Sequence, residues 1–326
     1  MSDLSKLFLR KQGYSEQDID YYYQNLNKLR EIIHPNKKFS SSEEHYIRTK
    51  DGNLVFYQVW KPDSINKMEK IIICQHGHNV HGDLFYPFAD HFSYNSLIIS
   101  IDNRGHGRSG PRLGDYYDYY KSIEIFEFFI RKYKNSYPEL PIFLIGESLG
   151  SALILHYLSK NFHGKKFING AILISTPIKL SIVDSIKKIY HSILLILSFL
   201  NVISNNSVFI KWPQDYDNPS YLDEFNKYDR EDILKRKFIS MRSIKTLLKV
   251  LVPLKSILYK IFKPILILQG TGDRILDPDG SRILYHRVRS HNKKMVFFKN
   301  ANHSLFMDKN SQEIYSIIEK WINSLF

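Results

Sequence analysis

The feature that most constrains the fold is a series of short apolar runs that alternate with segments long enough to be helices. Four runs, "KIIICQ", "SLIISID", "PIFLIG" and "GAILIS", are separated by residues 84–94, 116–134 and 149–160. The pattern resumes with "PILILQG" at 264–270 and "KMVFFKN" at 294–300. Uninterrupted apolar strands that alternate with helices are typical of a parallel sheet covered on both faces. The sequence therefore predicts an α/β fold.

Two further strands precede this series. The segments "HYIRT" and "NLVFYQVW" are rich in β-branched and aromatic residues, and the pair Asp51-Gly52 between them is a hairpin signal. With the six apolar runs they predict a mostly parallel sheet of about eight strands.

The rest of the chain divides around this sheet. Residues 1–40 are predicted to be helical, because Ser15 and Asp18 are spaced as the N-cap and third position of a helix. The long interval before residue 264 has apolar residues at helical spacing around 185–202 and 233–251, and an insertion of this size is typical of a lid. We therefore predict an N-terminal helical extension (1–40), a first core part (41–176), a helical cap (177–262) and a second core part (263–326).

The charge balance points to anionic partners. Lys and Arg number 46 against 33 acidic residues, a net charge of +13, yet no zinc-finger spacing, RNP-type strand or long basic run predicts nucleic-acid binding. Positive charge is concentrated in the cap, where residues 233–260 interleave basic and apolar residues at helical spacing, broken by Pro253. Such a basic amphipathic segment suits an anionic membrane surface. The basic residues are Lys235, Arg236, Lys237, Arg242, Lys245, Lys249, Lys255 and Lys260.

Three features bear on the compartment. The single cysteine, Cys74, lies inside an apolar run and leaves no internal disulfide, which suits a reducing environment. The N-terminus is charged from its third residue and lacks the apolar core of a secretory signal. The most apolar stretch, residues 192–203, is shorter than the roughly 18 residues of a spanning helix. We expect a cytoplasmic protein, with peripheral membrane contact through the basic cap.

One five-residue motif carries chemistry. Gly146-Glu147-Ser148-Leu149-Gly150 lies between an apolar run and a helical segment, the context of a Gly-x-Ser-x-Gly nucleophile elbow. The two glycines permit a sharp turn that projects the serine hydroxyl above the sheet edge. The backbone N–H of Leu149, at the helix start, can then donate to a developing oxyanion. The motif alone fits an ordinary Gly-Ser turn equally well.

A serine nucleophile needs a base and an acid that orients the base, and in this kind of fold both follow it in the chain. Asp273 comes just after the run at 264–270, and His303 just after the run at 294–300. Each alone would be an ordinary loop residue, but their order and their places after successive strands fit the two roles. Asp277 and Asp279 remain alternatives for the acid.

At this point the chain, over roughly residues 44–324, resembles the serine α/β-hydrolases, and within them the monoacylglycerol lipase and lysophospholipase group. The resemblance is carried by "HGH", "DNRGHGRSG", "GESLG", "LQGTGDRILDP" and "NANHSLF". It implies that Ser148 is the nucleophile, Asp273 the acid and His303 the base. The N–H groups of His78 and Leu149 would form the oxyanion hole. Glu147 departs from the group, many of whose lipases carry histidine there, and residues 1–40 are an addition to it.

The loop with His76, His78 and His81 raises another possibility, since its spacing resembles the zinc loop of metallo-β-lactamase-like hydrolases. That loop also has an aspartate before its last histidine, where Val80 stands here, so a ligand or base is missing. We therefore expect no metal and no cofactor. His76 is interpreted as a residue that shapes the loop, and Gly77 as one that lets the His78 N–H face a substrate carbonyl.

Several other polar residues near these motifs are expected to be structural. His81 and Asp83 are placed at the rim of the site. Asp102 and Arg104 are expected to tie loops together beneath it, and His106 belongs to the same glycine-rich connection. That connection lacks the lysine and glycine spacing of a phosphate-binding loop.

The predicted reaction is hydrolysis of a carboxylic ester through an acyl-enzyme, with single-chain lipids, monoacylglycerols or lysophospholipids, as substrates. The same three residues would also serve a soluble carboxylesterase, thioesterase, acyltransferase or peptidase. A hydrolase-like protein that binds a small ligand without turnover is the remaining alternative.

Overall fold

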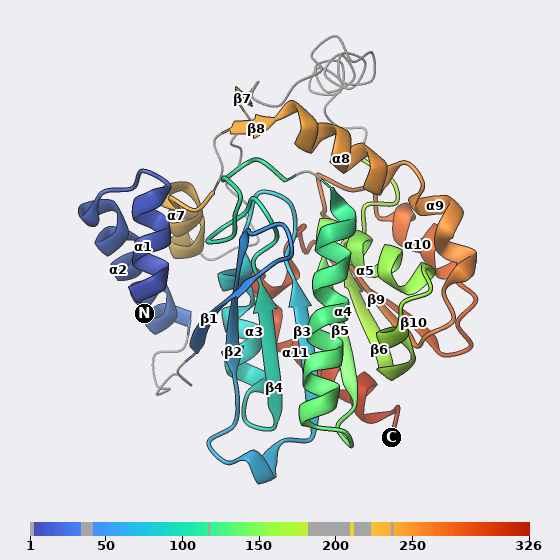
Figure 1. Ribbon diagram of the computed structural model, residues 1–326. Helices are drawn as coiled ribbons and strands as arrows, with labels where there is room; N and C mark the ends of the chain where they lie inside the picture. Colours follow the sequence, from blue (N-terminus) through green and yellow to red (C-terminus); the bar gives the residue numbers. More distant parts are fainter. Residues whose placement is uncertain (1–2, 34–41, 117, 182–208, 212–222, 236–237) are drawn as a thin grey trace.

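The structure of the protein, a computed structural model, describes residues 3–33, 42–116, 118–181, 209–211, 223–235 and 238–326. An eight-stranded sheet in the order β1-β2-β4-β3-β5-β6-β9-β10 forms its centre (Figure 1). The β1–β2 hairpin and the β2–β4 pair are antiparallel, and all other neighbours are parallel. The predicted α/β sheet is confirmed. Its strands are β1 (Glu43–Arg48), β2 (Leu54–Trp60), β3 (Lys70–Gln75), β4 (Ser96–Ile101), β5 (Ile142–Glu147), β6 (Ile168–Ile174), β9 (Ile265–Gly270) and β10 (Lys293–Phe298).

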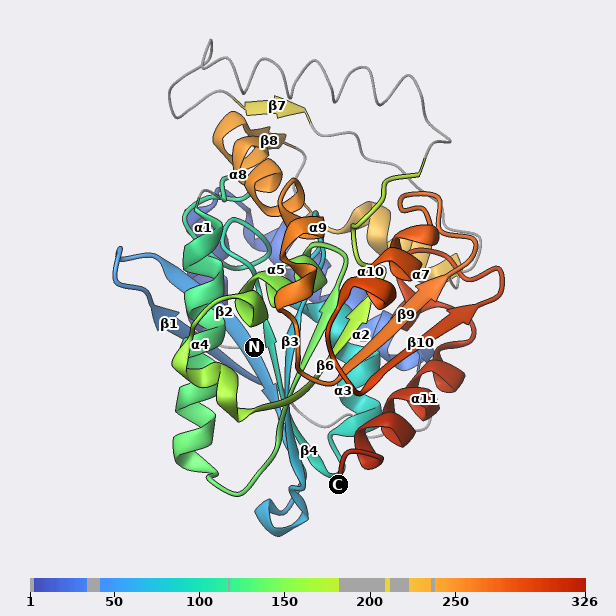
Figure 2. The ribbon, with the colours of Figure 1, turned by 90° about the vertical axis from the view of Figure 1, so that its right-hand side faces the viewer.

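Helices cover both faces of the sheet, and Figure 2 shows its strands between the two layers. The central strands β3, β4 and β5 are buried along their whole length, which explains why they are apolar without alternation. One face packs against α4 (Tyr119–Ser136), α5 (Leu149–Ser159) and α10 (Asp279–Arg287). The other packs against α3 (Tyr86–Phe92) and α11 (Ser311–Asn323). Short 3-10 helices are η1 (Ile65–Lys67), η2 (Gly82–Phe85), η3 (His163–Phe167) and η5 (Leu305–Met307).

Two helices, α1 (Asp3–Lys11) and α2 (Glu16–Ile33), precede the sheet. The predicted cap of the second helix is confirmed. The N–H of Asp18 donates to Ser15 Oγ at 3.2 Å, and the N–H of Ser15 donates to Asp18 Oδ2 at 3.0 Å. This reciprocal pair satisfies backbone donors that the first turn would otherwise leave without partners.

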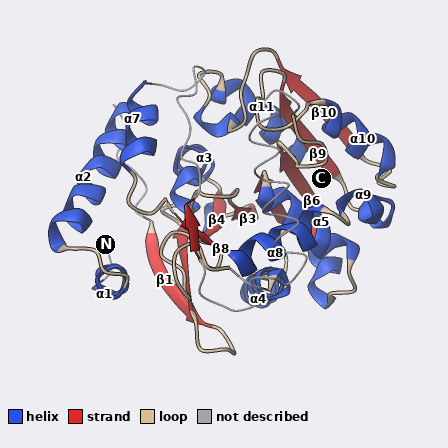
Figure 3. Ribbon diagram, turned by 90° about the horizontal axis from the view of Figure 1, so that it is seen from above, coloured by secondary structure: helices blue, strands red, loops and turns tan. Residues whose placement is uncertain are grey.

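Helix α2 lies beside α7 (Asp223–Glu231), as Figure 3 shows from above. An apolar cluster joins the two helices, and hydrogen bonds from two tyrosines add to it. Tyr14 Oη donates to the carbonyl of Ile233 at 2.6 Å, and Tyr21 Oη donates to Glu231 Oε2 at 2.8 Å. The beginning of the chain is therefore packed against its middle.

The described part of the interval between β6 and β9 contains a small antiparallel pair, β7 (Phe209–Lys211) and β8 (Phe238–Ser240), followed by α8 (Met241–Leu251), α9 (Leu254–Ile257) and η4 (Leu258–Lys260). The prediction of a helix throughout 233–251 was wrong in its first part. Helix α8 begins only at Met241, because β8 precedes it and Ser240 Oγ accepts the N–H of Ser243 at 3.2 Å. The other predicted helical stretch, 185–202, lies outside the described residues. None of the helices described is long and apolar enough to cross a membrane.

Candidate active site

The predicted nucleophile lies on a strained turn between a strand and a helix. Strand β5 ends at Glu147 and α5 begins at Leu149, so Ser148 alone makes the turn, with φ 53° and ψ −119°. A serine rarely adopts a positive φ, and such strain is found where the surroundings hold it. Here the Ser148 N–H donates to the carbonyl of Ile174 on the neighbouring strand at 2.9 Å.

The glycines of this motif are needed for space. A Cβ atom on Gly146 would lie 2.6 Å from the carbonyl carbon of Gly150, and one on Gly150 would lie 2.0 Å from the carbonyl oxygen of Gln75. Gly146 therefore lets the end of β5 lie against the first turn of α5, and Gly150 lets that turn lie against the end of β3. A Cβ on Gly77 would lie 3.1 Å from Ser148 Cβ, so the loop after β3 passes against the serine.

The two expected oxyanion donors belong to the segments that meet in this contact. Leu149 is the first residue of α5, and its N–H has no partner within the helix. His78 follows Gly77, and its ring Nε2 lies 2.9 Å from Tyr116 Oη. His76 is held inside the loop, because its Nε2 accepts the N–H of Asn103 at 2.8 Å.

The three histidines of the loop do not converge. His76 and His78 have the separate partners just given, and His81 Nε2 contacts Asp232 Oδ2 at 2.7 Å. Among the residues that the structure describes, no group of three or more His, Cys, Asp or Glu side chains is arranged to hold a metal ion.

The expected acid and base are in direct contact. His303 Nδ1 donates to Asp273 Oδ2 at 2.8 Å, from adjacent loops after β10 and β9. The Asp273 carboxylate also accepts the N–H groups of Ile275 and Leu276, each at 2.9 Å, and Gln269 Nε2 at 3.0 Å. This carboxylate is thus fixed in place, and it contacts His303 through Nδ1 and not through Nε2.

Burial and charge act in opposite directions on this pair. Burial acts to raise the pKa of Asp273, but His303 and the surrounding donors hold it below its usual value. Burial acts to lower the pKa of His303, but Asp273 and, to a smaller extent, Glu147 raise it above its usual value. The alternative acid Asp277 instead pairs with Lys179, with Oδ2 and Nζ 2.6 Å apart.

A buried network of charges lies under the loop that carries His78. We call it the Arg108 cluster and define it by Arg108, Asp83, Asp102, Glu44, His81, Asp232 and Tyr22. The Arg108 guanidinium is fully buried, and it lies 2.7 Å from Asp83, 3.3 Å from Glu44 and 3.6 Å from Asp102. Asp102 also accepts the N–H groups of Gly82 and Arg108, each at 2.7 Å. As predicted, Asp102 ties loops together.

The prediction that His81 and Asp83 lie at the rim of the site was wrong. Both are buried in the Arg108 cluster, where His81 contacts Asp232 and, at 3.4 Å, Asp83. Tyr22 of α2 also donates to Asp83. His81 and Asp83 are buried because segments distant in sequence, α2 and the residues that follow α7, cover this side of the loop.

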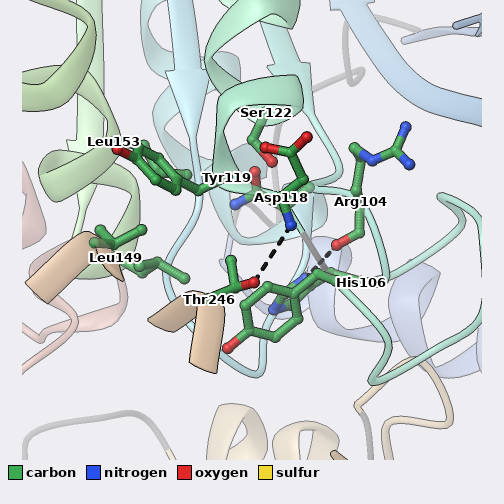
Figure 4. A pocket seen from close by; sticks show the side chains of 11 residues that line it. Arg104, His106, Asp118, Tyr119, Ser122, Leu149, Leu153 and Thr246 are labelled. Carbon is green, nitrogen blue, oxygen red and sulfur yellow. Dashed lines mark hydrogen bonds between the residues drawn. The ribbon is translucent and has the colours of Figure 1, made fainter. Parts of the chain in front are cut away.

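A pocket of about 320 Å³, including space open to solvent, adjoins the elbow at Leu149 (Figure 4). Asp118 and Thr246 lie across it, with the Asp118 N–H donating to Thr246 Oγ1 at 3.3 Å. Ser148 itself does not line the pocket. Its lining residues are Asn103, Arg104, His106, Tyr116, Asp118, Tyr119, Ser122, Leu149, Leu153, Thr246 and Val250.

Sequence reasoning missed several supports of this site. Besides the Gln269 contact, Ser175 Oγ donates to the carbonyl of His303 at 2.6 Å, across 128 positions of sequence. Arg108, Tyr22 and Asp232 were missed as well. No local pattern marks such residues, because only the folded chain brings them together.

The fold and the site define the class: a serine hydrolase with the α/β-hydrolase fold. The family model described as "Serine aminopeptidase, S33" (Hydrolase_4) matches residues 66–310, and the chain belongs to this family. Two relatives are a monoglyceride lipase homolog of monkeypox virus, 25% identical over 83% of this chain and 95% of that one, and the human monoglyceride lipase, 23% identical over 84% and 88%. A crystal structure of a soluble variant of monoglyceride lipase from Saccharomyces cerevisiae, in complex with a substrate analog, covers 89% of this chain and 98% of its own, with a TM-score of 0.77 and 22% identity.

These findings confirm the resemblance to the monoacylglycerol lipase group and the expected class, a serine ester hydrolase.

Proposed function

We propose that this protein hydrolyses carboxylic esters of single-chain lipids, monoacylglycerols first, through an acyl-enzyme on Ser148. The observation that carries the proposal is the 2.8 Å contact of His303 with Asp273, at the same edge of the sheet as the Ser148 elbow. This is the set of groups that a serine needs in order to attack a carbonyl at neutral pH.

In the proposed mechanism His303 Nε2 takes the proton of Ser148 as its Oγ attacks the ester carbonyl. The N–H groups of His78 and Leu149 hold the oxyanion of the tetrahedral intermediate. His303 then gives the proton to the leaving alcohol, and the acyl-enzyme remains. Water attacks the acyl group with His303 as base, which releases the fatty acid and restores the serine.

The lipid substrate is supported by the names of the relatives, two monoglyceride lipases and a monoglyceride lipase homolog. Lysophospholipids are the second candidate within the same chemistry. A thioesterase, an acyltransferase and, given the family's description, an aminopeptidase use the same nucleophile and differ in what the pocket accepts.

The experiment is a substrate panel run on the wild type and on Ser148→Ala. We expect turnover of monoacylglycerol above lysophospholipid, acyl-CoA and aminoacyl anilides, and labelling of the wild type by a fluorophosphonate probe. Ser148→Ala should lose on the order of 10³-fold or more in kcat and all labelling, with its thermal unfolding unchanged. Activity of this variant within tenfold of the wild type would reject Ser148 as nucleophile.

We also propose that residues 177–262 form a cap over the site and that part of it docks on anionic lipid. Two of the eight basic residues of 233–260 are used internally: Lys235 pairs with Asp229, and Arg242 pairs with Asp115. Arg236 and Lys237 lie outside the described residues.

Docking is best supported by the exposed basic residues along α8, α9 and η4. Lys249, Lys255 and Lys260 are exposed there beside Val252 and Phe262, whose exposed fractions are 76% and 60%. Exposed apolar side chains among lysines suit the boundary between lipid headgroups and acyl chains.

Co-sedimentation with vesicles tests this docking. Each lysine near an anionic surface contributes roughly 1 kcal/mol, so changing Lys249, Lys255 and Lys260 to Glu should weaken binding to anionic vesicles more than tenfold. The matched control changes three exposed lysines elsewhere, Lys50, Lys67 and Lys294, to Glu. Equal binding by both triple variants, or no preference of the wild type for anionic vesicles, would reject the surface.

A further inference from the structure

A second carboxyl group lies beside the proposed base. Glu147 is the last residue of β5 and directly precedes Ser148, and its side chain is buried. Its Oε1 accepts the hydroxyl of Ser304 at 2.5 Å. Since Ser304 follows His303 in the chain, this bond connects the strand that carries the nucleophile with the loop that carries the base.

This connection spans the sheet. Strand β5 is separated from β10 by β6 and β9, so the loop with His303 is not held to β5 by strand pairing. Ser175, after β6, donates to the carbonyl of His303, and Asp273, after β9, accepts from its ring. Glu147 supplies the third contact, from the side of the nucleophile.

The charges around His303 come from these same elements. The charged groups that act on its ring are Asp273, in the loop after β9, and Glu147, at the end of β5. Burial raises the pKa of Glu147, and Asp273 acts in the same direction, while His303 and the Ser304 hydroxyl oppose them. In a buried setting a nearby negative charge stabilises a protonated imidazole more strongly than it would in water.

The charge of Glu147 therefore has two effects on the reaction. Negative charge at Glu147 favours the imidazolium that forms when His303 takes the serine proton. It also keeps His303 protonated, and so inactive as a base, up to a higher pH. A neutral side chain of the same size would keep the hydrogen bond from Ser304 and remove both electrostatic effects.

Resting on the proposed function, we propose that Glu147 is a positioning residue for the base, which holds the His303–Ser304 segment and sets the pH at which ester hydrolysis begins. Its role differs from that of Asp273, which contacts the imidazole directly.

The test is the pH dependence of kcat/KM for a water-soluble p-nitrophenyl ester. In Glu147→Gln the acidic limb of the kcat/KM profile should shift to lower pH by about 0.5–1 pH unit, because the charge beside His303 is lost. KM should change little. On that limb the lower pKa of His303 alone would make the variant about 3–10 times faster than the wild type at the same pH, and the lost stabilisation of the imidazolium, measured as a lower plateau, offsets part of this gain. Glu124→Gln, which removes an exposed carboxylate on α4, is the control and should keep the wild-type limb.

Two further variants separate charge from tethering. Glu147→Asp keeps the charge on a shorter side chain, so its acidic limb should stay within about 0.3 pH unit of the wild type while kcat falls several-fold. Ser304→Ala should behave in the same way. If Glu147→Gln does not fold, Glu147→Met, which also removes the charge at a similar size, takes its place: an acidic limb at lower pH supports the proposal, and an unmoved limb overturns it. A limb that moves down in Glu147→Asp or Ser304→Ala also overturns it.

An unmoved limb in an active, folded Glu147→Gln also overturns the proposal, even if kcat falls, since a purely structural residue would behave so. Failure of the proposed function is a different result. In that case the wild type neither hydrolyses the ester nor reacts with a fluorophosphonate probe.

Discussion

Two groups of ionisable side chains lie near the carboxyl ends of the strands, and each is built around a histidine. His303 contacts one carboxylate, that of Asp273, and its side chain is 13% exposed. His81 contacts two, those of Asp83 and Asp232, and its side chain is 2% exposed. Burial acts to lower the pKa of His81, but its carboxylate neighbours raise it to about 10.

The difference separates the proposed base from a fixed charge. With a pKa of about 10, His81 keeps its proton at neutral pH and cannot accept one from a nucleophile. His303 contacts one carboxylate through Nδ1, and Nε2 is the nitrogen through which the proposed mechanism moves a proton. The contacts of the Arg108 cluster thus hold the loop that follows His78, and the Asp273–His303 pair is the one that the proposed mechanism uses.

The largest expected effect concerns the Asp273–His303 pair. Asp273→Asn should lower kcat on the order of 10²–10⁴-fold, because the amide favours the wrong tautomer of His303. Asp277→Asn is the matched control, since that carboxylate pairs with Lys179 instead, and it should stay within about threefold of the wild type. The measurement is ester hydrolysis at saturating substrate. Greater sensitivity of Asp277 would transfer the role of the acid to it.

The second prediction tests the fixed charges. Arg108→Met should lower the free energy of unfolding by about 3–5 kcal/mol, because it leaves the buried carboxylates of Asp83 and Asp102 without their partner. Arg131→Met, on the exposed side of α4, should change it by less than about 0.5 kcal/mol. Urea unfolding measures both. If Arg108→Met lowers the free energy of unfolding by less than about 1 kcal/mol, the ion pairs of the cluster contribute no more than exposed ion pairs do.

The third prediction uses pH to distinguish the two histidines. Folding raises the pKa of His81 from 6.5 to about 10, so the folded protein holds a proton that the unfolded chain releases above pH 6.5. Its stabilisation is complete below pH 6.5 and is lost as the pH rises towards 10, by up to about 1.4 kcal/mol per pH unit. Urea unfolding between pH 6.5 and 9 should therefore show falling stability in the wild type and a smaller slope in His81→Gln. Parallel slopes would show that His81 is neutral in the folded protein.

The smallest expected effect concerns the packing that covers the Arg108 cluster. Tyr21→Phe removes one hydrogen bond between α2 and α7 and should cost about 0.5–1 kcal/mol or less. Tyr94→Phe, which removes a similar exposed bond to Glu319, is the matched control and should cost the same. A loss above 2 kcal/mol for Tyr21→Phe alone would make its hydroxyl, rather than the apolar contact, the main link between the helices.

The sequence predicts the reactive group better than the fixed one, and the reason is geometric. Ser148, Asp273 and His303 each follow an apolar run, and the ends of parallel strands meet at one edge, so their neighbourhood follows from strand order. His81 and Asp232 are in contact across 151 positions, and neither follows a pattern that would pair them. The start of α8 was predicted too early for a similar reason, since β8 exists only through its pairing with β7.

The packing of α2 against α7 also has a consequence for how the chain folds. Tyr46 and Leu84 pack on the apolar cluster of α1 and α2, but its other partners, Phe225, Tyr228, Leu234 and Met307, are synthesised about 200 residues or more after Leu26. Contacts so distant in sequence form late, because a long loop must close before they can stabilise anything. Helices α1 and α2 thus keep part of their apolar surface exposed until α7 has been synthesised, and a chain that stops short of residue 223 has nothing from α7 to cover it.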